Sequence, residues 1–127
     1  MFNIILLNLA IIIIIVLLFI SKFNHIKEYY NEELSYQGWE LYTIENCTHC
    51  KTQLDDIPTY KNYIMFSEKG DIIYNPTNNH TTNLLISDIY AFPLWHNIYT
   101  KKKIYGVCDI KFIINYYAKE KEKEKEN

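Results

Sequence analysis

A long apolar run near the amino terminus is the strongest feature of the hydrophobic pattern. Residues 4–20 are apolar apart from Asn8. As a helix this run is about 26 Å long, which only just crosses a bilayer core of about 30 Å. A cleaved signal peptide would have a charged start and small residues before the cut, and neither is present. We therefore predict an uncleaved membrane anchor over residues 1–21, with a cleaved signal and a buried core helix as alternatives.

The segment after the anchor has the pattern of an amphipathic helix. Residues 22–38 place Phe23, Ile26, Tyr30 and Leu34 at spacings of three and four, and Gly38 is suited to the position that ends a helix. We predict a juxtamembrane helix or linker here. Two lysines in this segment favour a cytoplasmic domain under the positive-inside rule, although the orientation is left open. We expect a single-pass protein in an ER-type endomembrane.

The remaining chain alternates between strand and helix patterns. Residues 39–44, "WELYTI", predict a strand, and residues 47–56 predict a short helix with Asn46 as N-cap and Pro58 as its stop. Further strands are predicted at 62–66, 72–75, 94–100 and 103–107, and a short helix at 81–88. This order predicts one α/β domain over residues 39–119, with a mixed sheet flanked by helices on both faces.

The last predicted helix starts at Asp109, a plausible cap, and has an apolar stripe made by Ile110, Ile113, Ile114 and Tyr117. Residues 120–127 alternate Lys and Glu, so we expect a frayed, solvated tail.

Composition and charge exclude some classes of protein. The chain has 127 residues, of which 49% are hydrophobic, which is enough for one domain with a core. Its net charge of -2 provides no basic field, so nucleic acid is not an expected partner. Three cysteines are too few for a secreted scaffold held by disulfides.

Two of those cysteines, Cys47 and Cys50, are three positions apart at the start of the predicted helix. A thiolate is the attacking species in disulfide exchange, and unpaired N–H groups at a helix start stabilise an anion. His49 lies between the two and can tune the thiol pKa. This context favours a redox pair. A zinc site completed by Cys108, His80 or His96, and two ordinary core thiols, remain alternatives.

The sequence resembles the thioredoxin superfamily in three segments. "WELYTIENCTHC" is similar to the family's first conserved strand and active-site turn, and "DIYAFPLW" to the segment with its cis-proline. "KIYGVCDIKFIINYY" is similar to the last strand, its glycine (here Gly106) and the closing helix. The resemblance covers residues 34–119 and implies a thioredoxin-like fold.

The resemblance also implies roles for individual residues. Cys47 matches the family's nucleophile and Cys50 its resolving cysteine. Pro93 matches the cis-proline, and the backbone of Phe92 would pair with an extended substrate chain. Trp95 is close enough to border a substrate groove, although a core position is also expected for it. The activity implied is thiol–disulfide exchange with protein substrates, supported by a redox partner protein or glutathione, with no cofactor beyond the disulfide.

The motif and its surroundings depart from reducing thioredoxins. A histidine before the second cysteine resembles the disulfide isomerases and periplasmic oxidases, so we expect a more oxidising couple. The buried acid of thioredoxins falls near Leu41; Glu40 or Glu45 could replace it, although strand alternation predicts that both point outward. This departure keeps open a binding or assembly module with little catalysis.

Two further residues have plain expected roles. His96 is expected to be a partly buried core histidine. Cys108 is expected to be a small buried residue or, alternatively, a regulatory or inter-chain thiol.

Overall fold

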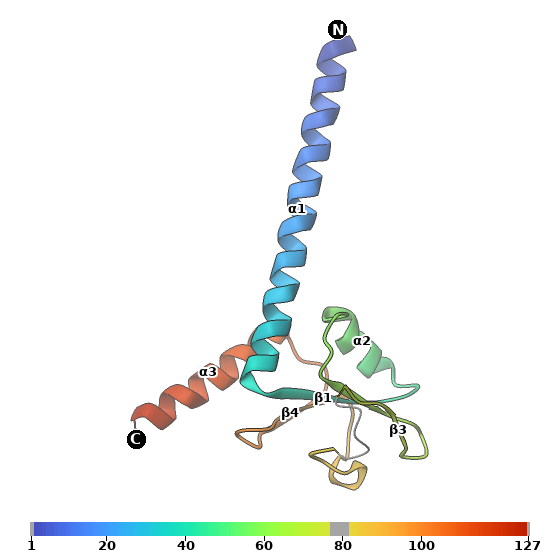
Figure 1. Cartoon of the computed structure of the whole chain (residues 1–127), viewed down its shortest axis with the longest axis vertical. Coiled ribbons are helices and arrows are strands. Elements are labelled where there is room, and N and C mark those ends of the chain that lie inside the picture. The colour runs from blue at the N-terminus through green and yellow to red at the C-terminus, as the bar shows by residue number, and fades with distance from the viewer. Residues whose placement is uncertain (1, 77–81, 127) are drawn as a thin grey trace.

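One long helix rises from a small sheet in the computed structural model, which describes residues 2–76 and 82–126 (Figure 1). The expected helix at 81–88 begins outside these residues, and its described part contains only a short 3-10 helix, η1. The elements in chain order are α1 (Phe2–Gln37), β1 (Trp39–Ile44), α2 (Thr48–Asp56), β2 (Tyr63–Phe66), β3 (Ile72–Tyr74), η1 (Ile86–Asp88), β4 (Leu94–Asn97), β5 (Lys103–Tyr105) and α3 (Ile110–Glu126).

The five strands form one mixed sheet in the order β3-β2-β1-β4-β5. Strand β1 is central and pairs in parallel with β2 and antiparallel with β4. The two outer pairs, β2 with β3 and β4 with β5, are antiparallel. The first five residues of β1 are all buried, because apolar or hydrogen-bonded side chains cover both of its sides. The prediction of an α/β fold with a mixed sheet is confirmed.

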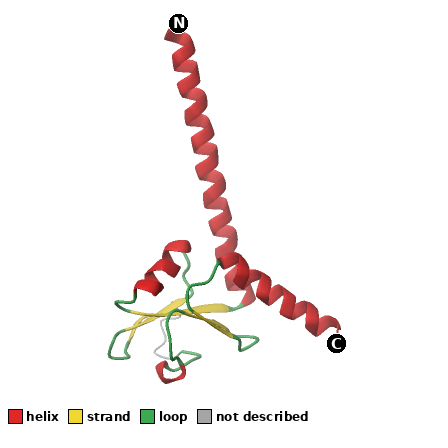
Figure 2. Ribbon diagram, turned by 180° about the vertical axis from the view of Figure 1, so that it is seen from behind, coloured by secondary structure: helices red, strands yellow, loops and turns green. Residues whose placement is uncertain are grey.

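All three α-helices pack on the same side of the sheet, which we call the helix face (Figure 2). Its buried core is formed by Leu34, Trp39, Leu41, Ile57, Tyr60, Trp95, Ile110 and Ile113. The opposite side, the loop face, is covered by residues 82–92 with η1, which bury Tyr42, Ile64, Phe66, Ile89 and Leu94. Among the described residues, the expectation of helices on both faces is met on the loop face only by the short 3-10 helix η1, and by no α-helix. Residues 82–92 provide scattered apolar side chains but no continuous amphipathic run before Pro93.

Helix α1 joins the predicted anchor and the predicted linker into one continuous element. Its apolar amino-terminal part is exposed on all sides and is long and apolar enough to cross a membrane. It ends where predicted, because Gly38 has φ +85°, and a side chain at Gly38 would meet the Tyr99 ring at 2.6 Å. No residue other than glycine fits there without moving that ring.

The last helix agrees with the prediction at its start and extends further at its end. The Asp109 side chain accepts a hydrogen bond from Lys111 N–H at 3.1 Å, and Ile113 is fully buried. Helix α3 continues through the Lys/Glu run to Glu126, so the expected frayed tail is helical in the structure.

Candidate functional site

The loop between β1 and α2 turns sharply before the two cysteines. Asn46 has φ +59°, a conformation that asparagine tolerates better than most residues, and its side-chain amide donates to the Glu68 carboxylate at 3.1 Å. The N-cap of α2 is Cys47, so the prediction that Asn46 caps the helix is wrong by one residue. A sulfur therefore occupies the position where a cap oxygen usually lies.

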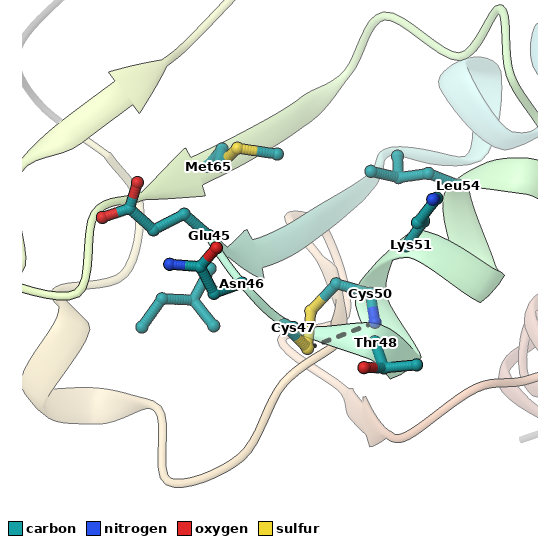
Figure 3. A pocket seen from close by; sticks show the side chains of 9 residues that line it. Glu45, Asn46, Cys47, Thr48, Cys50, Lys51, Leu54 and Met65 are labelled. Atoms are coloured by element: carbon teal, nitrogen blue, oxygen red, sulfur yellow. Dashed lines mark hydrogen bonds between the residues drawn. A yellow bond between two sulfur atoms is a disulfide. The ribbon is translucent and has the colours of Figure 1, made fainter.

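Cys47 and Cys50 form a disulfide at the start of α2, with their Cα atoms 5.2 Å apart (Figure 3). The Cys47 sulfur also accepts a hydrogen bond from the Cys50 backbone N–H at 3.2 Å. The two cysteines differ in exposure: Cys47 is half-buried, whereas Cys50 is only 2% exposed. An incoming group therefore reaches Cys47 more readily than Cys50.

An open hollow of about 520 Å³ adjoins the disulfide on the side of β2 (Figure 3). Its apolar wall comes from Ile44, Leu54 and Met65, and Lys51 is the cation among its lining residues. Glu45 also lines it, but its carboxylate is directed away from the sulfurs and accepts the Glu68 backbone N–H at 2.9 Å. The hollow is suited to an apolar side chain beside the reactive sulfur.

Gln53, one turn after Cys50, fixes α2 to the rest of the domain. Its side chain is fully buried. Its amide oxygen accepts from Trp95 Nε1–H at 3.0 Å and from Cys108 N–H at 2.7 Å. Its amide nitrogen donates to the Cys108 carbonyl at 3.0 Å. These bonds hold the reactive helix against β4 and the segment before α3, and sequence analysis did not single Gln53 out.

The peptide bond between Phe92 and Pro93 is cis. In the β1–β4 register Tyr42 pairs with Leu94, so the preceding residue, Pro93, continues alongside the carboxyl end of β1, where the cysteine loop begins. Pro93 is buried and its carbonyl accepts Gly106 N–H at 2.8 Å, whereas Phe92 is half-buried. The segment expected to bind substrate thus starts at the same edge of the sheet as the disulfide.

Trp95 belongs to the core of the helix face. Its side chain has no exposed surface and its indole N–H is used by Gln53. The expectation that Trp95 borders a substrate groove is corrected accordingly, because strand alternation places it under α2.

Glu40 is buried on the loop face, contrary to the expectation that it points outward. One carboxylate oxygen accepts from Tyr42 OH at 3.1 Å and contacts His96 Nδ1 at 2.9 Å, and the other accepts from Asn83 at 3.0 Å. Leu41 faces the helix core instead. The sheet therefore separates the Glu40 carboxylate from α2, and His96 is a core histidine as expected.

The remaining candidates are His49, Cys108 and His80. His49 is exposed on the first turn of α2. Cys108 is a free, half-buried thiol whose pKa is raised by burial. Within residues 2–76 and 82–126, no group of three or more His, Cys, Asp or Glu side chains could hold a metal ion, and His80 lies outside these ranges.

Two parts of this arrangement had a weak signal in the sequence. Gln53 is a polar residue at i+3 from Cys50, so it lies on the same face of the helix as Cys50. A buried amide in that place indicates a hydrogen-bonded anchor. The lining of the hollow by Met65 depends on the parallel pairing of β1 with β2, which no local pattern reveals.

Comparison with protein-family models, with curated proteins and with solved structures found no match to this chain.

Proposed function

We propose that this chain is a membrane-anchored thiol–disulfide oxidoreductase of thioredoxin type that exchanges disulfides with protein substrates. The observation that carries the proposal is the Cys47–Cys50 disulfide at the amino end of α2, with one accessible and one buried sulfur. A strand, this pair, a helix and a later cis-proline occur in the order that the resemblance implies.

The exchange balances without a cofactor. A substrate thiolate attacks the Cys47 sulfur, a substrate–Cys47 disulfide forms, and Cys50 leaves as a thiolate. A second substrate thiolate then attacks the substrate sulfur of that mixed disulfide, and Cys47 leaves. Two electrons pass from the substrate dithiol to the cysteine pair, and the released protons go to solvent or to the reduced pair. The reverse sequence reduces a substrate disulfide.

The helix start favours Cys47 as the leaving and attacking group. The Cys50 N–H already points at the Cys47 sulfur at 3.2 Å, and this donor together with the helix dipole stabilises a thiolate there. The exposed His49 adds a second group that can lower the thiol pKa when it is protonated. Stabilising the reduced form makes the couple a stronger oxidant, as the C-T-H-C motif leads us to expect.

The anchor completes the proposal. The apolar part of α1 has no exposed polar face and none of it packs on the domain, which supports a membrane span over a core helix. In cells, the intact chain should stay in the membrane after alkaline carbonate extraction. Mass spectrometry of the extracted protein should show that residues 1–21 are still present. A chain that lacks these residues would identify a cleaved signal instead.

The direct test is trapping with Cys50→Ala. Without its resolving thiol, Cys47 should remain covalently bound to substrates in a mixed disulfide that dithiothreitol releases, visible on non-reducing gels. Cys47→Ser in the same background should trap nothing. Cys108→Ser is the matched control, because it removes the third thiol and should leave trapping unchanged. Equal trapping by Cys47→Ser would overturn the proposed role of Cys47.

A binding or assembly module is the second candidate, and one observation favours it. The carboxylate of Glu40 is on the loop face and Leu41 occupies the helix face, so the proton relay of reducing thioredoxins has no counterpart at that position of β1. Insulin reduction by the full chain in detergent distinguishes the two. A rate that is at background and unaffected by Cys47→Ser favours the module.

A further inference from the structure

We infer that the disulfide is mounted at a fixed height beside the bilayer and acts on cysteines in the juxtamembrane segments of proteins in the same membrane. This inference rests on the proposed function, because it requires both the exchange reaction and the span. It names the substrate class by position: a cysteine within about eight extended residues of the membrane surface.

The span and the domain form one rigid unit. Helix α1 runs without interruption from its apolar part to Gln37, and Leu34 near its end is fully buried in the core. Gln37 donates to the Ile114 carbonyl at 3.1 Å and accepts from Trp39 Nε1–H at 3.0 Å, and its own carbonyl accepts from Asn97 at 2.8 Å. With these bonds in place, no flexible linker separates the anchor from the sheet.

The height of the domain follows from the length of the helix. Asn31 of α1 hydrogen-bonds Thr59, three residues after α2, and so sets the level of the carboxyl end of α2. Eleven residues separate Ile20, the end of the apolar run, from Asn31, which is about 17 Å of helix. The headgroup layer takes up about 6 Å of this distance, which leaves about 11 Å. Helix α2 itself is about 14 Å long, so Cys47 at its other end lies within about 25 Å of the headgroups.

The reactive helix also faces the bilayer. Helix α2 lies on the same side of the sheet as the span of α1, and η1 lies on the far side, in both views (Figures 1 and 2). A protein chain that leaves the bilayer extends about 3.3 Å per residue, so about eight residues cover 25 Å. A cysteine on such a short segment is held in the layer that contains Cys47, which raises its effective concentration.

The hollow beside the disulfide agrees with a juxtamembrane partner. Its wall of Ile44, Leu54 and Met65 is apolar and adjoins Cys47 and Cys50. Trp and Tyr are enriched where a membrane span meets the membrane–water interface. An aromatic side chain next to the substrate cysteine can therefore be buried in the hollow while the sulfur reaches Cys47.

The test is done in nanodiscs and varies two distances from the membrane: that of the substrate cysteine and that of the Cys47–Cys50 pair. The probe is a single-span peptide with one cysteine placed 4, 8, 16 or 30 residues beyond its span, blocked as a mixed disulfide with 5-thio-2-nitrobenzoate. Full-length Cys50→Ala, reduced beforehand and co-assembled with the probe, attacks the peptide sulfur through the Cys47 thiolate. The coloured thiolate that leaves gives the rate. A second variant carries 18 helical residues after Lys27, which adds five full turns and about 27 Å without rotating the domain. The control variant carries the same insertion after Asn127.

With the original helix, the cysteine at 8 residues should react fastest, because four extended residues cover only about 13 Å and fall short of Cys47. The insertion after Lys27 should slow the cysteine at 8 residues at least tenfold and spare the cysteine at 30 residues, whereas the insertion after Asn127 should change nothing. Rates that depend neither on the tether length nor on the inserted helix would overturn the inference. They would leave the proposed oxidoreductase function intact. A soluble peptide of the same sequence is the reference. If neither the soluble nor the anchored probe reacts, the proposed function itself fails.

Discussion

Replacing Gln53 with leucine should destabilise the domain more than any exposed substitution in α2. Leucine has a similar volume but cannot hydrogen-bond, so Trp95 Nε1–H and both backbone groups of Cys108 lose their partner. The indole N–H is fully buried, and leaving it unsatisfied costs about 1–3 kcal/mol. The Cys108 groups are half-buried and water can reach them, so we assign about 0.5–1 kcal/mol to each.

Together these contributions lower the free energy of unfolding by about 2–5 kcal/mol. The whole free energy of unfolding is about 5–15 kcal/mol for a typical domain. With a urea slope of about 1.5 kcal/mol/M, a loss of 3 kcal/mol lowers the unfolding midpoint by about 2 M. Tryptophan fluorescence of the full chain in detergent measures this midpoint, because Trp95 lies at the site of the change. Thr52→Ala, an exposed substitution on the same helix, is the control and should stay within about 0.5 kcal/mol.

A functional consequence separates this anchor from ordinary packing. When α2 loosens from β4, Cys50 should become accessible, although it is only 2% exposed in the native domain. In reduced protein, iodoacetamide should therefore modify Cys50 faster in Gln53→Leu than in the unmutated chain, well below the unfolding midpoint. A midpoint within 0.3 M of the unmutated chain, with Cys50 still protected, would refute the assigned role of Gln53.

Three other predictions concern titration and redox chemistry. Burial raises the pKa of Tyr42 and Tyr60, so the native state keeps their protons at a pH where the unfolded chain loses them. The free energy of unfolding should therefore fall as pH rises above about 10. Urea titrations between pH 8 and 11 measure this fall, and Tyr60→Phe should make the dependence of the free energy on pH less steep. Burial also raises the pKa of Cys108, so after reduction iodoacetamide should modify Cys47 before Cys108 at pH 8, as peptide mass spectrometry can show. Equilibration with glutathione should give a potential above the value of about −270 mV for thioredoxin, and His49→Ala should lower it; a value at or below thioredoxin's contradicts the oxidising assignment.

The sequence predicted those parts of the fold that depend on local pattern. The strand at 39–44 and the apolar stripe of the last helix are in the structure with nearly the predicted bounds. The end of the first helix at Gly38 was also predictable, because a positive φ at that position requires glycine. In each case the period of apolar residues or one special residue was enough.

Other parts depend on contacts that no local pattern encodes. The alternation of β1 places Glu40 on the face opposite to Leu41. The prediction that Glu40 is exposed assumed that this face, the loop face, is open to solvent. Residues 82–92 close that face and supply Asn83, so the carboxylate is buried among donors. The helix cap is Cys47 and not Asn46 for a similar reason. The Asn46 side chain donates its hydrogen bond to Glu68, which lies in a turn distant in the sequence. Tertiary contacts decided both outcomes.

The position of the disulfide follows from how β1 joins α1 to the cysteines. Only Gly38 separates α1 from β1, and Glu45 and Asn46 separate β1 from Cys47. Six strand residues cover about 20 Å, so β1 carries the reactive pair sideways from the axis of α1 by a set distance. Because β1 is the central strand, its neighbours β2 and β4 hold this arm straight. Under the proposed function, a flexible tether would let the pair sample many substrates near the membrane, whereas this rigid arm would select those whose cysteine lies at the same height and at the same lateral distance from α1.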